Sequence, residues 1–463
     1  MKFGHKIKGV VTHYDAKGRG SLTIQNNDHS ESTVTIPFSA VGDELTATFI
    51  RRDRGTKLAK VAEIHTPSPD RVATPCPHAG TCGGCLWQHL KYTAQLTLKQ
   101  QRINQAFETA EHAERITDVL PCPPASPDDE MRAYYRNRMD YAVGWNGEIG
   151  LKEHEAWNRY VDIKTCFLLN AEAGNILEHV RVWMKAHDLL PWDAKFYTGD
   201  IRYVVIREGK KTHERLIIIV VHDAKRITDE QRKTLLEALS PFATSLLIGE
   251  QPKQTDLSYA ETFETLKGNP WLEEVVNDVR YRIHPNSFFQ TNTVMAEQLQ
   301  NVVLELVGAG LKPAPTQILD LYCGLGFFGL ALAKQHPDIS VAGFEIDAEA
   351  IELAKHNAAT NGVAERCHFT SGPAEDLSWK DLPADLIILD PPRAGLHPKV
   401  IKTLLEKKAQ TLIYVSCNYH RLVEELKQLK TLYTITELKA LDLFPHTPHV
   451  EVVVRMELKT HSN

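Results

Sequence analysis

A cysteine and three carboxylic acids in the last third of the chain occupy positions where side chains can take part in covalent chemistry. Cys417 ends the apolar run TLIYVSC, Asp390 ends ADLIILD just before two prolines, and Glu345 ends SVAGFE. Glu451 begins the apolar run EVVVRMEL. A cysteine thiolate is a strong nucleophile, and a positioned carboxylate can remove a proton from an intermediate. These residue types indicate an enzyme with a covalent intermediate, provided that the fold brings them together.

A glycine-rich loop identifies the element that could gather these side chains. The β-rich run TQILDLY is followed by the loop and then by the helix-forming run FFGLALAKQ. This order predicts a Rossmann-like strand, loop and helix that bind a nucleotide-bearing cofactor at the carboxyl end of the strand. Gly324 and Gly326 allow the sharp turn, and Gly329 allows close helix–strand packing. Glu345, about twenty residues further on, would accept the ribose hydroxyls of either NAD or S-adenosylmethionine (AdoMet).

The strands after the loop favour methyl transfer over hydride transfer. In a parallel sheet the carboxyl ends of the strands share one edge, so Gly324, Glu345, Asp390 and Cys417 should converge on one crevice. A nicotinamide oxidoreductase has no need for the cysteine. Methylation of carbon 5 of a pyrimidine needs it, because that carbon becomes nucleophilic only after a thiolate adds at carbon 6. Glu451 could then remove the carbon-5 proton, with an exposed edge-strand carboxylate as the alternative interpretation.

The first 65 residues predict a small β-barrel. Five short β-rich runs, KIKGVVTHYD, GSLTIQ, STVTIPFS, DELTATFIRR and LAKVAEIH, are separated by Gly, Asp and Asn. Five short strands in this length favour a closed barrel. The segment has more Lys and Arg than Asp and Glu, with Arg51 and Arg52 in a cluster. This basic surface could bind RNA, or it could be an ordinary solvated face.

Three cysteines crowd into ten residues directly after a Pro-rich linker at 66–75. They are Cys76, Cys82 and Cys85. Three thiolates leave a tetrahedral metal site one ligand short. His78 or His89 could complete a zinc site, whereas an iron–sulfur cluster would need a distant fourth cysteine, for which Cys166 in VDIKTCFLL is the natural candidate. Spacing alone does not choose between the two metals.

The run RAYYRNRMDY interleaves arginines and aromatic residues at strand-like spacing. The arginines are Arg132, Arg136 and Arg138. Because arginine neutralises phosphates and aromatic faces stack on bases, the run could be a platform for RNA. An edge strand with alternating exposed arginines is the structural alternative.

Length and composition describe a protein of several domains. A chain of 463 residues predicts about three domains. No apolar run is long enough to span a bilayer, and the first residues, MKFGHKIKGV, lack the apolar core of a secretory signal. We therefore expect a cytoplasmic protein with no membrane partner, no obligatory protein partner and no disulfide framework. The net charge of −6 gives no general argument for nucleic acid, so RNA binding must rest on local patches.

Several motifs together resemble the RNA 5-methyluridine (uracil-C5) methyltransferases, over essentially the whole chain. They are D-P-P-R-x-G at Asp390, V-S-C-N at Cys417, D-x-F-P-H-T-x-H-x-E ending at Glu451, N-S-F-F-Q-x-N at Gln290 and C-x5-C-G-G-C-x-x-Q-H at Cys76. The loop D-x-x-x-G-x-G-x-x-G also resembles that of class I AdoMet methyltransferases. The resemblance implies Cys417 as nucleophile and Glu451 as proton acceptor. It also implies AdoMet as cofactor, bound by Gln290, Tyr322, Gly324, Gly326, Glu345 and Asp390.

The same resemblance implies roles for the rest of the chain. The metal group would be a structural [4Fe–4S] cluster with the ligands Cys76, Cys82, Cys85 and Cys166. The stretch PFSAVGDELTATFIRRDRGTKLAKVAEI is similar to a TRAM domain, an OB-like barrel that carries RNA-binding enzymes onto their substrates. Phe327 is a departure, since some relatives have Asn there, and one polar cofactor contact is therefore expected to be missing.

The expected fold class is α/β and β, in three domains. These are a TRAM OB-like barrel at 1–66, a central α+β iron–sulfur domain at 67–275, and a Rossmann-like class I methyltransferase domain at 276–463, with a helix near 91–117 that could pack on the last domain. Expected RNA contacts are Arg132, Arg136, Arg138, Arg51 and Arg52. Barrel and cluster together look most like the branch that makes 5-methyluridine in 23S ribosomal RNA. The T-loop uridine of tRNA is the alternative target, and a non-catalytic RNA-binding metalloprotein is the alternative of another class.

Overall fold

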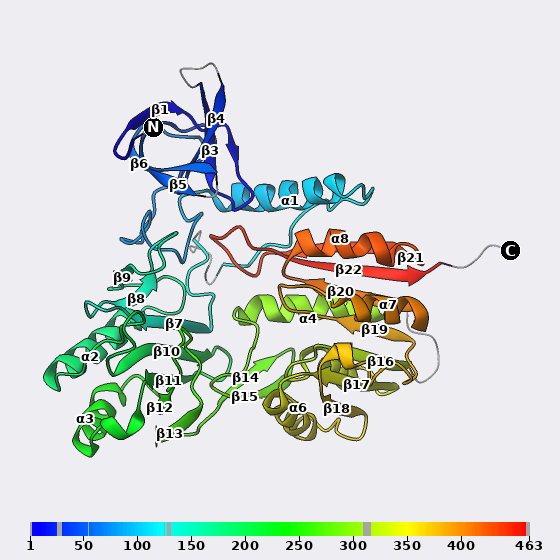
Figure 1. The fold of residues 1–463 in the computed structure, drawn as a ribbon. Helices are drawn as coiled ribbons and strands as arrows, with labels where there is room; N and C mark the ends of the chain where they lie inside the picture. The colour runs from blue at the N-terminus through cyan, green and yellow to red at the C-terminus, as the bar shows by residue number, and fades with distance from the viewer. Residues whose placement is uncertain are drawn as a thin grey trace.

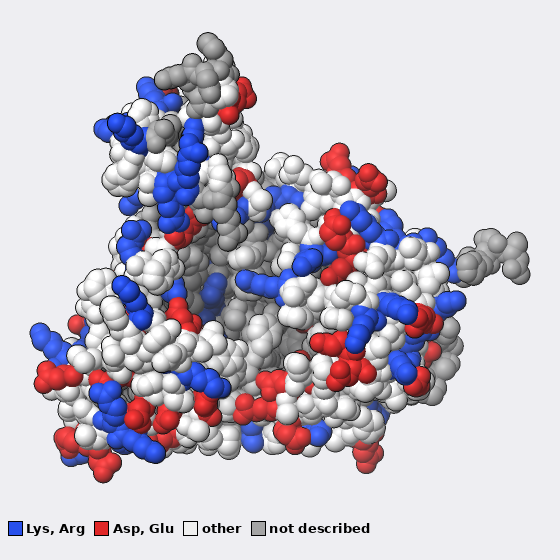
Figure 2. Space-filling model, in the orientation of Figure 1, with Lys and Arg blue, Asp and Glu red and all other residues white. Residues whose placement is uncertain are grey.

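The computed structural model describes residues 2–25, 30–53, 55–124, 126, 131–308 and 316–459. Their strands form three large sheets and one separate hairpin, and the sheets follow one another along the chain (Figure 1). The three bodies meet around a central recess, which Figure 2 shows as a hollow between them. This arrangement allows residues from all three sheets to reach one cavity.

The N-terminal sheet is rolled around a small core of its own. Its strands, in the order β1-β5-β6-β4-β3-β2, are β1 (Lys6–Val10), β2 (His13–Tyr14), β3 (Gly20–Gln25), β4 (Glu31–Ile36), β5 (Glu44–Asp53) and β6 (Thr56–Thr66). The edge strands β1 and β2 are consecutive in the chain, so the sheet curls around Ile7, Leu22 and Leu45. The sequence predicts five strands here. The structure has six because Val11 donates its N–H to Asp43 and Thr12 to Ser21, which divides the first predicted strand.

The central sheet is seven-stranded and mixed. Its strands, in the order β13-β12-β11-β10-β7-β8-β9, are β7 (Arg138–Val143), β8 (Ile149–Lys152), β9 (Tyr160–Asp162), β10 (Ile201–Gly209), β11 (Glu214–Val221), β12 (Ser245–Glu250) and β13 (Thr262–Lys267). Helices α2 (Ala173–Ala186) and α3 (Asp229–Leu239), with the short turn η1 (Ala224–Arg226), accompany the sheet, and apolar residues of both helices join its core. The hairpin of β14 (Leu272–Val276) and β15 (Val279–Ile283) leads to the C-terminal body.

The C-terminal sheet has the Rossmann-like form expected of the glycine loop. Its order is β18-β17-β16-β19-β20-β22-β21, and the first five strands are parallel. The strands are β16 (Thr316–Leu321), β17 (Ile339–Glu345), β18 (Cys367–Ser371), β19 (Leu386–Leu389), β20 (Thr411–Ser416), β21 (Tyr433–Leu441) and β22 (Glu451–Leu458). The helices are α4 (Thr293–Gly308), α5 (Phe327–Gln335), α6 (Ala348–Thr360), α7 (Pro398–Lys407) and α8 (Tyr419–Leu429), with the turn η2 (Ala374–Asp376). The methyltransferase fold predicted for this part of the chain is confirmed.

Helix α1 (Tyr92–Thr109) comes early in the chain but packs on α8 of the C-terminal body (Figure 1). Its Ile103 and Phe107 belong to the same apolar core as the last sheet. The buried Lys99 ammonium donates to Asp442 Oδ1 at 2.5 Å, and the Tyr92 hydroxyl donates to Asp442 Oδ2 at 2.8 Å. The turn between β21 and β22 is therefore fixed by a helix from the first quarter of the chain.

Candidate active site

Five adjacent strands bring the predicted side chains to one edge of the C-terminal sheet. The parallel strands β17, β16, β19 and β20 end at this edge, and β22 begins there because it runs antiparallel to β20. Neighbouring strands lie about 4.8 Å apart, so the edge presents side chains in a regular row. In order, the row consists of Glu345, Tyr322, Asp390, Cys417 and Glu451. The predicted convergence of strand ends is present.

Cys417 and Glu451 are neighbours because of the pairing of β20 with β22. Ser416 is opposite Val452 in this ladder, so the next residue outward on each strand is Cys417 and Glu451 respectively. The Cys417 side chain reaches the wall of the central cavity, on the same edge as the glycine loop. A thiol and a carboxyl from distant parts of the chain thus lie at one place.

Burial raises the pKa of both Cys417 and Glu451. It is the main cause that raises the pKa of the Cys417 thiol to about 11, and Glu451 and Asp390 act in the same direction while Arg393 opposes them. Burial, followed by Asp390, also raises the pKa of the Glu451 carboxyl well above its usual range. A carboxyl with a raised pKa is a stronger base once it is ionised, which suits proton removal.

The glycine loop has the backbone that a cofactor site needs. Gly326 precedes α5 with φ of 81°, and a Cβ there would come within 2.9 Å of Leu330 and Phe369. The Gly329 N–H donates to Asp320 Oδ2 at 3.0 Å, and the Gly324 N–H donates to Glu345 Oε2 at 3.2 Å. These bonds orient both acids along the edge, where a nucleoside would lie.

The acids at this edge fit a cofactor that carries positive charge. Burial is the main cause that raises the pKa of Asp320 to about 7 and of Asp390 to about 8. Asp320 Oδ1 is buried and has no hydrogen-bond partner among the described residues. A nearby cation would stabilise the ionised form of each carboxyl. The sulfonium of AdoMet supplies such a charge.

Gln290 and Phe327 lie close behind the loop in different surroundings. Gln290 is buried, and its main-chain carbonyl accepts from Asn137 Nδ2 at 2.9 Å, which ties its backbone to the central body. The Phe327 ring packs edge-on against Phe289, with centroids 5.9 Å apart. Because that ring is part of the core, the position that is Asn in some relatives makes an apolar contact here.

Comparison with known proteins identifies the family. Residues 214–459 match the family described as tRNA (Uracil-5-)-methyltransferase. The chain is 36% identical over 451 residues to the tRNA (uracil(54)-C(5))-methyltransferase of Pyrococcus horikoshii, an alignment that covers 97% of this chain and 100% of that protein. The chain belongs to the RNA uracil-5-methyltransferase family. Its reaction is therefore the AdoMet-dependent methylation of carbon 5 of uracil in RNA, as the sequence motifs predict.

Two further relatives extend this result. The 23S rRNA (uracil(747)-C(5))-methyltransferase of P. horikoshii is 32% identical over 453 residues, covering 97% of this chain and 99% of that protein. The crystal structure of Pyrococcus abyssi tRNA (uracil-54, C5)-methyltransferase in complex with S-adenosyl-L-homocysteine superposes with a TM-score of 0.78 at 32% identity, covering 97% of this chain and 99% of that one. Both similarities run through all three sheets of this uracil-5-methyltransferase.

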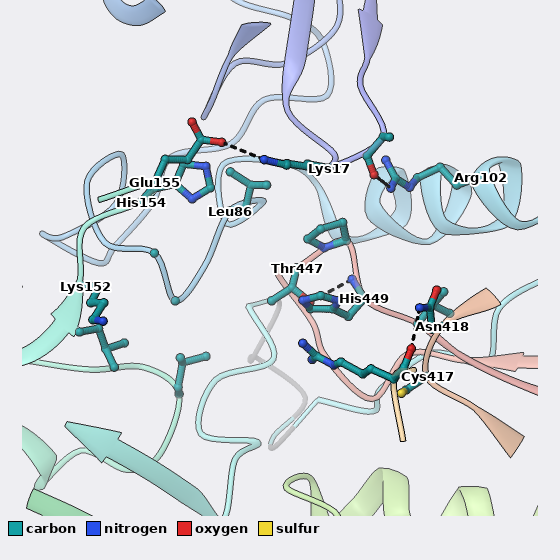
Figure 3. Close-up of a pocket in the computed structure, with 18 of the residues that line it drawn as sticks. Lys17, Leu86, Arg102, Lys152, His154, Glu155, Cys417, Asn418, Thr447 and His449 are labelled. Carbon is teal, nitrogen blue, oxygen red and sulfur yellow. Dashed lines mark hydrogen bonds and ion pairs between the residues drawn. The ribbon is translucent and has the colours of Figure 1, made fainter. Parts of the chain in front are cut away.

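The cavity of the uracil-5-methyltransferase lies between the three bodies and has a volume of about 760 Å³. Figure 3 shows Lys17 of the N-terminal body, Lys152 and His154 of the central body, and Cys417 and His449 of the C-terminal body around it. The sequence predictions include only Cys417 of these five. A space of this size between a basic wall and a nucleophile can admit one nucleotide that has left its stack. Within the described part of the chain, no helix is both long and apolar enough to cross a bilayer.

The three arginines of the RAYYRNRMDY run do not share one exposed face. The Arg132 guanidinium lies 4.4 Å from the centre of the Tyr92 ring, and Arg138 is paired with Asp140 at 2.8 Å. Arg136 lines the cavity. In the N-terminal sheet, Arg51 and Arg52 are neighbours on β5 and both are exposed. A role in RNA binding for these five residues stays a prediction.

The four predicted cluster cysteines approach one another, but the structure does not show the iron–sulfur site. Among the residues it describes, no three His, Cys, Asp or Glu side chains are arranged to hold a metal ion. Burial raises the pKa of the Cys82 thiol to about 11, and Cys166 and Cys76 act next in the same direction. Burial raises the pKa of Cys85 as well, and Cys82 and Cys166 reinforce it. All four thiols are free.

Alkylation of Cys417 is expected to become faster as the pH rises. Because the thiol pKa is about 11, the thiolate fraction of the enzyme without AdoMet should increase about tenfold per unit between about pH 7 and pH 10. Iodoacetamide labelling, followed by mass spectrometry of the Cys417 peptide, measures this rate. Cys122 is the matched control, since its pKa is also about 11 but its side chain is buried away from the cavity. A labelling rate that does not change with pH would show that the thiol is already ionised.

Proposed function

We propose that this protein methylates carbon 5 of a uridine with Cys417 as the nucleophile and Glu451 as the base. The observation that carries the proposal is the pairing of β20 with β22, which makes these two residues neighbours at the edge where the glycine loop ends. A thiolate and a base are the two groups that the chemistry of carbon 5 requires. The row of acids beside them lies on the sheet edge at which a Rossmann-like fold binds a nucleoside such as that of AdoMet.

Each residue has one step in the proposed reaction. The Cys417 thiolate forms a bond from sulfur to carbon 6, and the electron pair of the ring double bond moves to make carbon 5 nucleophilic. AdoMet supplies the methyl group, which carbon 5 takes as the sulfonium becomes a thioether. The Glu451 carboxylate removes the proton from carbon 5, the double bond forms again, and the bond from sulfur to carbon 6 breaks to return the thiolate.

The target uridine must leave its stack before Cys417 can reach carbon 6. Inside a helix or a stacked loop, the neighbouring bases cover both faces of the uracil ring and so shield carbon 6. Enzymes that modify bases therefore turn the nucleotide out into a pocket. The cavity between the three bodies is open to this entry, and Asn418 beside the nucleophile donates its Nδ2 to the Arg393 carbonyl at 2.9 Å (Figure 3). We infer that this bond keeps the floor of the cavity in place while the base enters.

Two RNA targets fit the chain, and the T-loop uridine of tRNA has the stronger support. In one organism, P. horikoshii, the tRNA enzyme is 36% identical to this chain and the 23S rRNA enzyme 32%. Both relatives align with 97% of the chain, which includes the N-terminal sheet and the cysteine segment. The presence of those two parts therefore does not select 23S rRNA, on which the sequence expectation was based. A uridine of 23S rRNA remains the second candidate.

Mapping of 5-methyluridine separates the two targets. RNA from a strain without the gene is digested, and the modified nucleosides of purified tRNA and 23S rRNA are measured by mass spectrometry. Loss of 5-methyluridine from tRNA alone supports the first target, and loss from 23S rRNA alone supports the second. Transcripts of both RNAs, incubated with the enzyme and AdoMet, repeat the test in solution. No methylation of either RNA would contradict the proposed function.

We also propose that the N-terminal sheet is a TRAM-like RNA-binding barrel and that Cys76, Cys82, Cys85 and Cys166 bind a structural [4Fe–4S] cluster. The rolled six-stranded sheet with exposed basic residues supports the first part. The second part is supported by the closeness of the four thiols. The Cys166 thiol lies near enough to Cys76, Cys82 and Cys85 to contribute to the raised pKa of each. His78 fits a zinc site less well, because its Nε2 lies 3.2 Å from the Lys164 backbone nitrogen as a hydrogen-bond partner.

Protein purified without oxygen is expected to be brown and to contain about four irons per chain. Cys166→Ser should lower the iron content and the visible absorption, because a cluster of this type needs four thiolates. Iron analysis and absorption spectroscopy make the measurement. Cys122→Ser is the control, since Cys122 has no place among the four thiols and should leave the iron content unchanged. Stoichiometric zinc in a colourless protein would contradict the cluster.

A further inference from the structure

Two exposed tryptophans come from adjacent connections of the central body. Trp157 is 70% exposed and Trp145 is 55% exposed, although tryptophan is on average among the well-buried residues. Trp157 belongs to the loop 153–159 between β8 and β9, and Trp145 to the turn between β7 and β8. Trp145 Nε1 donates to the Asn158 carbonyl at 3.2 Å, which brings the loop and the turn together. We call these two residues the indole pair.

The loop that carries Trp157 is held in one shape. At its base, Arg159 Nε donates to Glu153 Oε2 at 2.6 Å, and the Glu153 N–H donates to the Arg159 carbonyl at 2.9 Å. Within the loop, Glu155 has a φ of 59°, its carboxylate pairs with Arg19, and its carbonyl accepts from Arg51 Nη2 at 3.0 Å. The N-terminal sheet thus fixes the loop, so a ligand that binds the indole pair loses little free energy in ordering it.

The same loop forms part of the wall of the cavity that contains Cys417. Residues 152–155 line it, and Figure 3 shows His154 and Glu155 beside Lys17 on the side opposite the nucleophile. The cations here are more exposed than their partners. The Lys17 side chain is 59% exposed and that of Glu155 12%, and the Arg159 side chain is 67% exposed and that of Glu153 28%. The solvent therefore meets mainly positive charge beside the two aromatic rings.

We propose that the indole pair is a stacking platform for unpaired bases that flank the target uridine. The inference rests on the proposed function, because it places the RNA strand that leaves the cavity over the loop 153–159. Aromatic rings stack on the face of any base, and the neighbouring cations meet the phosphates of the same strand. A protein partner could also use exposed tryptophans, but exposed cations beside a nucleotide-sized cavity match a polyanion.

The test measures RNA affinity without AdoMet, so that its result does not depend on methyl transfer. Binding of a fluorescein-labelled tRNA transcript and of a labelled 23S rRNA transcript is measured. For the transcript that is the substrate, Trp157→Ala is expected to weaken binding by roughly tenfold. Trp157→Phe keeps an aromatic face and should recover most of the affinity. RNA should also quench the tryptophan fluorescence of the unaltered protein, and Trp157→Ala should lose part of that quenching. The kcat at saturating RNA should stay the same while KM rises.

The control is Phe196→Ala, which removes another ring of similar exposure, 66%, from the segment between α2 and β10 and not from the loop 153–159. The platform would be overturned if the double variant Trp145→Ala/Trp157→Ala bound RNA as tightly as the unaltered protein and if RNA did not quench the tryptophan fluorescence of the unaltered protein. The indole pair would then be assigned to binding of a protein partner. An equal loss in Phe196→Ala would overturn it as well, since the effect would then not belong to this surface. Failure of the proposed function would give a different result. The protein would still bind RNA through the indole pair, but it would form no 5-methyluridine with AdoMet.

Discussion

Replacement of Cys417 by alanine should abolish methyl transfer, with a loss of roughly 10⁴-fold or more in kcat, as for other enzymes deprived of their nucleophile. Carbon 5 of uracil is activated only while sulfur is bound at carbon 6, and Cys417 is the thiol at the cavity wall where the strand ends converge. Transfer of labelled methyl from AdoMet to RNA measures the loss. AdoMet itself should bind as before, because its predicted contacts lie on the neighbouring strands.

The control for this variant is Cys367→Ala, which removes a buried thiol at the start of β18. It should retain activity, with at most a modest loss of stability from the small cavity. Calorimetry with AdoMet shows whether Cys417→Ala is folded and binds the cofactor. Retained turnover in Cys417→Ala, with binding intact, would remove this residue from the reaction.

Glu451→Gln should trap the enzyme on its RNA. The amide has nearly the shape of the carboxyl but cannot accept the carbon-5 proton, so the bond from sulfur to carbon 6 cannot break in the normal way. Turnover should fall by roughly 10²- to 10⁴-fold, the usual contribution of a positioned base. A protein–RNA adduct that survives denaturing electrophoresis, at a molar ratio near one, is the expected product.

The pH should act on the same step in the unaltered enzyme. Since burial raises the pKa of Glu451, the carboxyl is protonated below that pKa and ionised above it. Breakdown of a preformed adduct should therefore be slower at lower pH and faster at higher pH. It is followed after the adduct has formed, because formation itself slows at lower pH as the Cys417 thiolate fraction falls. Glu437→Gln on β21 is the control, because its exposed carboxylate pairs only loosely with Lys439 at 3.8 Å. Normal turnover in Glu451→Gln, without an adduct, would assign proton removal to another group.

The sequence predicts the row of side chains at the sheet edge better than it predicts the cavity. Asp390 and Cys417 each end an apolar run, and parallel strands must align such ends, so local patterns are sufficient. Glu451 is harder, because its place depends on the antiparallel pairing of β22 with β20, which links residues far apart in the chain. Its assignment before the structure rested on family resemblance rather than on the strand pattern.

The cavity wall was not predictable because its members come from separate sheets. Lys17 and His154 are common polar residues in loops, and no motif distinguishes them before the three bodies are placed. His449 belongs to the motif that ends at Glu451, but the motif assigns it no role in a cavity. The run RAYYRNRMDY shows the opposite difficulty. Its spacing predicts exposed arginines, but long-range partners such as Tyr92 and Pro285 engage Arg132 and Arg138 instead. Partners that come from distant parts of the chain leave no trace in local spacing.

The contact between α1 and the last sheet has a practical consequence for anyone who shortens this gene. A fragment that starts at residue 276, or even at residue 214 where the family match begins, would lack α1. The carboxylate of Asp442 would then lose both of its α1 partners, the Lys99 ammonium and the Tyr92 hydroxyl. The apolar side of α8 would also be open to water. Such a fragment should aggregate on expression, and the supply of α1 as a separate peptide should restore its solubility.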